Sequence, residues 1–164
     1  MSQNSTLNMT ISNVNLSGIT CKVLTFNSPE QLDSIELRRQ VLRLPLGLDF
    51  NRSDLDKESD QFHVGAFIDN SLVGILLLKA MSDLGDDILK MRQVAVNPVN
   101  QGQGIGRVLV QFSEQLANEK GYRIIDLHAR KSVVPFYEKL GYHIEGDEFL
   151  EVGIPHLRMI KRLN

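Results

Sequence analysis

Residues 91–112 read MRQVAVNPVNQGQGIGRVLVQF, and the interpretation of the whole chain starts from them. The apolar and β-branched residues at 91–96 predict a strand, which Asn97-Pro98 ends. A loop with glycines at 102, 104 and 106 follows, and apolar residues then recur at helical spacing: Ile105, Val108, Leu109, Phe112 and Leu116. Such a loop binds anions, because the first helical N–H groups have no intrahelical partner and the helix dipole adds partial positive charge. Phosphate is therefore the expected ligand.

The spacing of the glycines narrows the choice of phosphate compound. A dinucleotide-binding loop, G-x-G-x-x-G, would need glycine where Arg107 stands, and the chain holds no P-loop sequence. It does hold a Q-x-x-G-x-G hexad at 101–106, directly after the strand end Val94-Ala95-Val96. This combination resembles the acetyl-coenzyme A signature of the GNAT superfamily of N-acetyltransferases.

Two downstream segments resemble the same superfamily. Residues 129–142, ARKSVVPFYEKLGY, resemble the short helix after the fifth strand, which ends in an F-Y-x-K-L-G-aromatic pattern. Residues 149–159, FLEVGIPHLRM, resemble the F-x-E-x-G-I-P-H-x-x-M tail of one bacterial subgroup whose acceptors are unassigned. In element order the resemblance covers roughly residues 19–163.

Composition limits the class of protein. The 164 residues suit one domain, expected at 19–164, after a flexible N-terminal tail at 1–18. A net charge of −2 gives no sign of nucleic acid as a partner, and the longest apolar run, 72–78, is too short to cross a membrane. No secretory or transit signal is evident, so a cytoplasmic location is expected. The single cysteine, Cys21, is expected to be a buried, inert thiol, and no metal site is expected.

The pattern of elements predicts a mixed α/β domain. Strands are expected at 19–26, 62–68, 72–78, 88–96, 122–129, 142–149 and 153–163. Helices are expected from Ser28 to about Arg43, from Gly104 to about Lys120, and from an N-cap at Ser132 to Leu140. The polar stretch 46–61 reads as a loop or a second short helix. The resemblance implies a GNAT-like, mostly antiparallel central sheet with splayed fourth and fifth strands and helices on both faces.

The resemblance also implies a place for acetyl-CoA as co-substrate. The N–H groups of residues 101–107 would hold its pyrophosphate, and the edge of strand 94–96 would pair with the pantetheine amides. Gln101 replaces an arginine that is also seen at that position. The expected cofactor-binding residues are Val94, Ala95, Val96, Gln101, Gly102, Gln103, Gly104, Ile105, Gly106, Arg107 and Phe136. Core packing is the alternative role for Phe136, because it lies four residues before Leu140.

The sequence identifies the catalytic residues less clearly than the cofactor-binding residues. Tyr137 matches the family tyrosine that protonates the departing thiolate, although packing in a short helix is the alternative. The fourth-strand glutamate that serves as base in some members is here Lys90. Candidate bases are His63, His128, Glu151 and His156, and a structural role is the alternative for each. The resemblance places Glu151 and His156 on the last hairpin, facing the acceptor.

The sequence therefore predicts an acetyl-CoA-dependent N-acetyltransferase that moves an acetyl group to a primary amine by direct attack in a ternary complex. The acceptor is a small molecule or a peptide, and a homodimer is possible because dimers are common in the family. A non-catalytic acyl-CoA-binding regulatory module and a nucleotide-binding domain are the alternatives. The acidic run at 54–60 is expected to be solvated, with attraction of a cationic amine as the alternative. Arg38, Arg39 and Arg43 are expected on an exposed helix face, with contact to the 3′-phosphate of the cofactor or to an acidic acceptor as the alternative.

Overall fold

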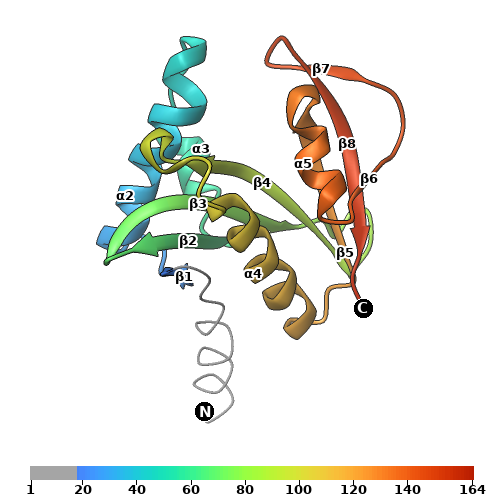
Figure 1. The fold of residues 1–164 in the computed structure, drawn as a ribbon, viewed down its shortest axis with the longest axis horizontal. Coiled ribbons are helices and arrows are strands. Elements are labelled where there is room, and N and C mark those ends of the chain that lie inside the picture. Colours follow the sequence, from blue (N-terminus) through green and yellow to red (C-terminus); the bar gives the residue numbers. More distant parts are fainter. Residues whose placement is uncertain (1–17) are drawn as a thin grey trace. The chain divides into compact units, whose positions relative to one another are not determined.

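The computed structural model describes residues 18–164, so the predicted tail lies outside the described residues except for Gly18. The chain divides into two compact units. The first holds the residues up to Leu78 together with Gln93–Leu116, and the second holds Lys79–Arg92 together with Ala117–Asn164. The strands follow the order β1-β2-β3-β4-β5-β8-β6, and β7 pairs with β8 (Figure 1). The sheet is mixed and mostly antiparallel, as expected.

The strands of the first unit form a meander. β1 (Ile19–Leu24) pairs antiparallel with β2 (Phe62–Ile68), and β2 pairs antiparallel with β3 (Ser71–Ala80). Asp69 and Asn70 connect β2 and β3 with φ angles of 49° and 64°. Left-handed residues at both central positions suit a two-residue hairpin, because the turn then matches the twist of the strands. β4 (Ile88–Val96) begins in the second unit and ends in the first.

The helical segment after β1 begins as predicted and then changes its winding. Ser28 caps α2 (Pro29–Arg38) by accepting a hydrogen bond from the N–H of Gln31. The segment continues as a π-helical turn, Arg39–Arg43, and a 3-10 turn, Leu44–Leu46, which Gly47 ends at φ 71°. α3 (Arg52–Asp56) forms the predicted second short helix, with Asn51 as its N-cap. The π-helical turn was not predicted.

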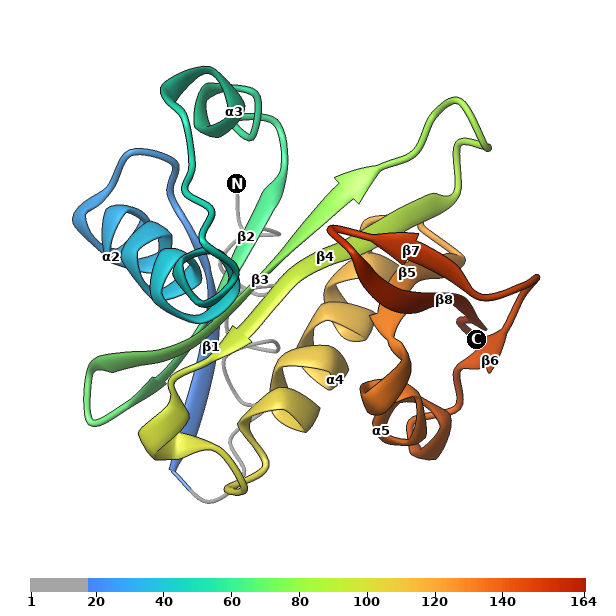
Figure 2. The same ribbon diagram turned by 90° about the horizontal axis from the view of Figure 1, so that it is seen from above.

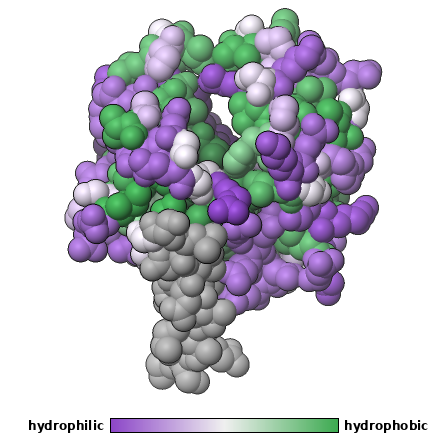
Figure 3. Space-filling view, in the orientation of Figure 1, coloured by the Kyte–Doolittle hydropathy of each residue, from purple (hydrophilic) through white to green (hydrophobic). Residues whose placement is uncertain are grey.

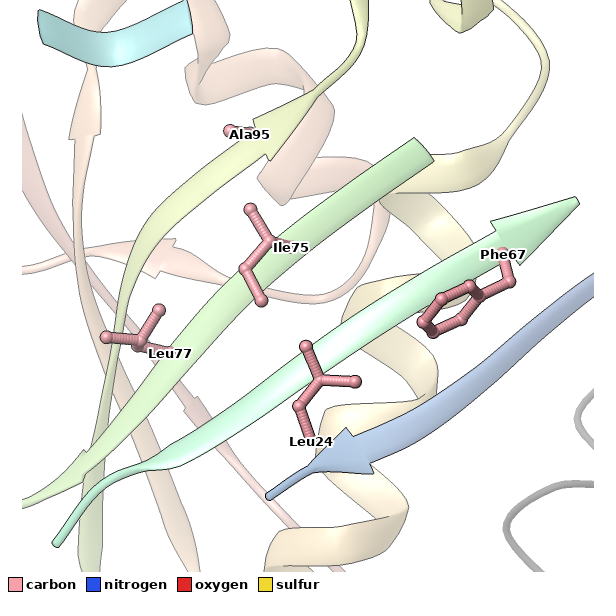
Figure 4. Close-up of a cluster of buried hydrophobic side chains, with 5 residues drawn as sticks. All are labelled: Leu24, Phe67, Ile75, Leu77 and Ala95. Atoms are coloured by element: carbon pink, nitrogen blue, oxygen red, sulfur yellow. The ribbon is translucent and has the colours of Figure 1, made fainter. Parts of the chain in front are cut away.

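Helices cover both faces of the strands in the first unit. On one face, Leu24, Phe67, Ile75, Leu77 and Ala95 form a buried cluster (Figure 4), against which Leu37, Val41 and Leu42 of the α2 segment pack. On the other face lies α4 (Ile105–Glu119), which follows the 3-10 turn Pro98–Asn100. Gly74 of β3 faces Ile105 and Leu109 of α4. This arrangement confirms the expected covering of both faces.

Gly74 allows α4 to approach β3 closely. A Cβ atom at position 74 would lie 2.9 Å from Leu109 Cδ1 and 3.0 Å from Ile105 Cγ2. Both side chains are buried, so they have little room to move. We expect Gly74→Ala to lower the free energy of unfolding by about 1–3 kcal/mol through overpacking. Urea unfolding measures this change, and a midpoint equal to that of the wild type would contradict it.

The second unit is built around β5 (Ile124–Arg130). β4 pairs parallel with β5 only over Ile88–Met91 and Ile124–Leu127, which is the pattern that the expected splay of these strands requires. β8 (Ile154–Arg162) pairs antiparallel with β5 along its whole length. β7 (Phe149–Glu151) folds back on β8 (Figure 2). The short helix α5 (Val134–Lys139) follows β5 through a 3-10 turn, Lys131–Val133.

Two details of this unit differ from the prediction. Ser132 lies inside the 3-10 turn, and Val133 precedes α5 without any side-chain cap. Pro135 in the first turn of α5 has no N–H, so one of the groups that a cap would satisfy is missing. The expected strand 142–149 is also wrong, because Gly146 takes a φ of 86° and separates β6 (His143–Ile144) from β7.

Cys21 lies in β1 with none of its surface exposed. Burial raises the pKa of its thiol to about 12. Because the thiolate is the reactive form, the prediction of an inert thiol is confirmed.

Within residues 18–164 no helix is both long and apolar enough to cross a membrane. Hydrophilic and hydrophobic residues are interspersed on the face shown in Figure 3. The described part of the chain also has no group of three His, Cys, Asp or Glu side chains arranged to hold a metal ion.

Candidate active site

The glycine-rich loop has the backbone form that an anion needs. Gly102 and Gly104 have φ angles of 82° and 83°. A Cβ atom at Gly102 would meet nothing within 4 Å, so the loop is open at this point. In the described part of the chain, the N–H groups of residues 102–107 donate no hydrogen bond. Consecutive free N–H groups in such a loop, at the start of α4, form a concave binding place for phosphate oxygens.

The strand end beside this loop is held by its own contacts. Ala95 is buried in the core, and Val94 and Val96 are half-buried. The side chain of Gln101 donates a hydrogen bond from Nε2 to the carbonyl of Val96, 3.3 Å away. Gln101 is therefore turned back toward the strand, and the loop amides remain the groups available to an anion.

Gln93 is a feature of β4 that the sequence did not reveal. Its φ of 57° is left-handed, which costs about 1–3 kcal/mol for a residue other than glycine. Its Oε1 atom is buried without a hydrogen-bond partner in the described structure. Gln93 immediately precedes Val94-Ala95-Val96, the segment expected to bind pantetheine. Strain of this kind is often concentrated at functional sites.

Tyr137 is the most enclosed candidate of the second unit, with 6% of its surface exposed. Its ring lies edge-on to Phe136 at 5.0 Å and to Tyr142 at 5.6 Å between centroids. Burial raises the pKa of its phenol to about 12, so the hydroxyl keeps its proton at neutral pH. Its hydroxyl makes no hydrogen bond within residues 18–164. A protonated phenol without an internal acceptor can donate to a bound group.

Three of the four candidate bases come together on the last strands. Glu151 Oε1 lies 2.9 Å from His128 Nδ1, and Glu151 Oε2 lies 3.6 Å from His156 Nε2. The ring of Phe149 contacts both imidazoles, edge-on to His128 at 5.0 Å and stacked with His156 at 6.1 Å. His128 comes from β5, Glu151 from β7 and His156 from β8, so only the paired strands bring them together.

The charges around Glu151 favour its ionised form. Burial alone would raise the pKa of this carboxyl, but the hydrogen bond with His128 and the charges of His128, His156 and Lys90 outweigh it, so its pKa is lowered. Lys90, where some family members carry glutamate, is half-buried. Burial lowers the pKa of its ammonium group, Arg92 adds to the effect, and Glu151 opposes it. Lys90 therefore places an amine, not a carboxylate, at this position of β4.

His63 belongs to the structural interior of the first unit. It is buried, its Nε2 lies 2.9 Å from the carbonyl of Glu58, and its ring faces Phe26 at 5.7 Å. The bond holds the segment after α3 against β2, which favours the structural role over the catalytic one.

The prediction that Arg38 lies on an exposed face of α2 is wrong. Its side chain is fully buried and makes two hydrogen bonds to Glu58, of 3.0 and 2.8 Å. Glu58 is correspondingly buried, so the acidic run is not solvated throughout. The guanidinium groups of Arg38 and Arg43 each lie 4.9 Å from the ring centroid of Phe50. The sequence did not predict the contact between Arg38 and Glu58, because the two residues are 20 positions apart and are joined by several short helical turns and loops.

Known proteins resemble this chain along most of its length. A family model described as an acetyltransferase (GNAT) domain matches residues 49–163. A Bacillus subtilis (strain 168) protein named as an acetyltransferase is 30% identical over 133 residues, which cover 79% of this chain and 87% of that protein. The crystal structure of an N-acetyltransferase from Lactobacillus plantarum has a TM-score of 0.77 at 21% identity, covering 90% of this chain and 100% of the other.

A second solved structure was determined with its ligand. It is a GNAT family acetyltransferase from Elizabethkingia anophelis with acetyl-CoA bound. Its TM-score is 0.68 at 18% identity, and the match covers 90% of this chain and 100% of that chain. At these identities the two solved structures establish the fold.

Proposed function

Because this chain belongs to the GNAT acetyltransferase family, we propose that it transfers the acetyl group of acetyl-CoA to a primary amine. The observation that carries the proposal is the row of unbonded N–H groups at 102–107, which follows Val94-Ala95-Val96 after one short turn. The bound acetyl-CoA of the Elizabethkingia anophelis protein supports the choice of co-substrate.

The residues of the first unit fit a coenzyme A diphosphate. Gly102 through Arg107 offer donors without competing internal acceptors, and the left-handed glycines leave the loop open. Val94, Ala95 and Val96 would pair with the pantetheine amides as an added strand. When bound, acetyl-CoA supplies the thioester carbonyl that the amine attacks.

In the second unit, Tyr137 would act as the general acid. The amine nitrogen forms a bond to the carbonyl carbon, the carbon–sulfur bond breaks, and its electron pair goes to sulfur. Tyr137 then gives its proton to the thiolate. The high pKa of Tyr137 keeps this proton in place at neutral pH. No acyl-enzyme forms in this scheme, in keeping with the inert Cys21.

The proposal is tested by titrating the purified chain with acetyl-CoA, with ATP and NAD as controls. We expect acetyl-CoA to bind in the micromolar range, about −8 kcal/mol, and the two nucleotides to give no signal. Release of coenzyme A in the presence of primary amines, followed by liquid chromatography, then separates an enzyme from a non-catalytic binding module. Absence of acetyl-CoA binding would refute the proposal.

Gly104→Ala should raise the dissociation constant for acetyl-CoA by about tenfold or more. The φ of 83° is strained for any residue with a Cβ atom, and a shift of the loop would misalign its N–H groups. Gly121→Ala is the matched control, because Gly121 has a similar φ of 89° but lies after α4, away from the loop. Isothermal titration measures both. Equal affinities of the two variants would contradict the loop's role.

A further inference from the structure

We propose that His128 is the general base that accepts the proton of the acceptor amine, and that Glu151 is the residue that orients it. This inference rests on the proposed acetyl transfer. It assigns the base to a residue on β5 and makes Glu151 its positioning residue. The evidence is the hydrogen-bond pattern around Glu151 in the second unit.

The hydrogen bond to Glu151 fixes which nitrogen of His128 is free. An ionised carboxylate can only accept hydrogen bonds, and a glutamate carboxyl is ionised at neutral pH. His128 Nδ1, 2.9 Å away, must therefore carry the proton and donate it. In the neutral ring, Nε2 then holds the lone pair. Within the described residues this Nε2 makes no hydrogen bond, and 27% of the side chain is exposed.

His156 is held in a way that excludes it from the same task. Its Nδ1 lies 2.7 Å from the carbonyl of Ile154, and because a carbonyl only accepts, Nδ1 carries the proton. Its Nε2 faces Glu151 Oε2 at 3.6 Å, and only 7% of its side chain is exposed. The Nε2 atom of His156 is therefore enclosed beside the Glu151 carboxylate, whereas Nε2 of His128 has no hydrogen-bond partner within the described residues.

The strand register places the acid and the base on different faces. On β5, His128 alternates with Leu127 and Ala129, and Leu127 pairs with Met159 of β8. Lys161 lies on the Met159 face, where its ammonium donates a 2.7 Å hydrogen bond to the carbonyl of Leu140 after α5. The helix that carries Tyr137 thus lies on the face opposite to His128.

Other charged groups share the environment of His128. From the register of the strands, the face around it carries both signs of charge. Asp126 is neutralised by Arg158, with hydrogen bonds of 2.8 and 2.6 Å. The titratable and charged groups on the face of His128 are Lys90 and Arg92 of β4, Asp126 and Arg130 of β5, Glu151 of β7, and His156 and Arg158 of β8.

The proton balance of the step is complete without another reactant. The amine loses one proton to His128 Nε2 as its nitrogen bonds to the carbonyl carbon. Tyr137 gives one proton to sulfur as the carbon–sulfur bond breaks. His128 then holds the proton that solvent must return to Tyr137 before the next turnover.

The first test compares pH profiles. Spermidine, L-lysine, kanamycin and a peptide that begins with alanine are offered with acetyl-CoA, and the fastest acceptor is used as the probe. At pH 7, His128→Gln should lower kcat/KM by about 100-fold and leave the dissociation constant for acetyl-CoA within twofold. The deficit should shrink as the pH rises, because hydroxide in the solvent then accepts the proton that His128 accepts at neutral pH. A variant with the pH profile of the wild type would overturn the proposal.

Two further variants distinguish the role of His128 as proton acceptor from the positioning of its ring by Glu151 and from non-specific effects of replacing a histidine. Glu151→Gln should lower kcat/KM less than His128→Gln does, by about tenfold, because glutamine can still accept from Nδ1 but lacks the charge. His143→Gln is the matched control. His143 lies 3.2 Å from Glu145 in another histidine–glutamate pair of the same unit, but it is exposed on β6. It should keep the wild-type pH profile, and a loss equal to that of His128→Gln would contradict the assignment.

The second test needs no acceptor. Two-bond ¹H–¹⁵N correlation spectra of ¹⁵N-labelled protein report which nitrogen of each neutral histidine carries the proton, and the His128 signals are identified by their loss in His128→Gln. We expect the Nδ1-protonated form in the wild type and a changed mixture in Glu151→Gln. The Nε2-protonated form in the wild type would refute the proposal. If wild-type protein fails to bind acetyl-CoA, the proposed function fails instead, whichever form is seen.

Discussion

Tyr137→Phe should lower kcat by about 100-fold or more while the dissociation constant for acetyl-CoA stays within twofold. The substitution removes the proton that neutralises the departing thiolate but keeps the ring that packs against Phe136 and Tyr142. Because burial raises the pKa of Tyr137 to about 12, its phenol keeps its proton throughout the neutral pH range. An alkaline loss of activity well below that pH therefore belongs to another group. Steady-state kinetics with the best amine acceptor measures the change.

Tyr142→Phe is the matched control for this variant. Tyr142 is also buried, lies in the same aromatic group and has Lys161 over its ring at 5.6 Å. Removal of its hydroxyl should leave kcat within a few-fold of the wild-type value. If both variants lose kcat equally, the effect of position 137 is one of packing. If Tyr137→Phe keeps full turnover, another group protonates the thiolate.

Arg38→Met should lower the free energy of unfolding by about 3–5 kcal/mol. The Glu58 carboxylate would then lie buried without the two hydrogen bonds that now compensate its charge. The contact of Arg38 with Phe50 would also be lost. Urea unfolding followed by circular dichroism measures the midpoint and slope.

Three further variants define the origin of this loss. Arg39→Met breaks the exposed pair with Asp49 and should leave the unfolding midpoint unchanged, because water solvates the remaining charge. Arg38→Met combined with Glu58→Leu should recover part of the stability, because no unpaired charge is left buried. Glu58→Gln is a milder substitution if Arg38→Met does not fold. A single Arg38→Met variant as stable as the wild type would contradict the importance of the pair.

The predictions that succeeded rest on local chemistry. Ser28 and Pro29 began α2, and Cys21 alternated into the buried face of β1. In both cases neighbouring residues decide the conformation. The turn at Asp69-Asn70 likewise depends on two adjacent residues. Local rules therefore accounted for β1, β2, β3 and β4 and for the helix that follows the glycine-rich loop.

The features that escaped prediction depend on residues far apart in the chain. Arg38 meets Glu58 only after α3 has folded back, and a charged residue on a helix is otherwise expected to face water. His128 and Glu151 are adjacent only through the pairing of β5 with β8 and of β8 with β7. The left-handed φ of Gln93 was not predicted, because a glutamine within a strand ordinarily takes extended backbone angles. The prediction of Ser132 as the N-cap of α5 was wrong for a local reason, because Pro135 reduces the need for a cap.

The burial of Cys21 has a practical consequence for following turnover. Coenzyme A leaves the reaction as a free thiol, and a chromogenic disulfide reports such a thiol as it appears. The chain's single sulfhydryl is fully enclosed in β1 and holds its proton up to a pKa of about 12. The folded protein therefore adds no colour of its own, and every acceptor can be screened continuously at high enzyme concentration. Because Cys21 does not react in the folded protein, a slow rise in colour that comes from Cys21 indicates that the protein has begun to unfold.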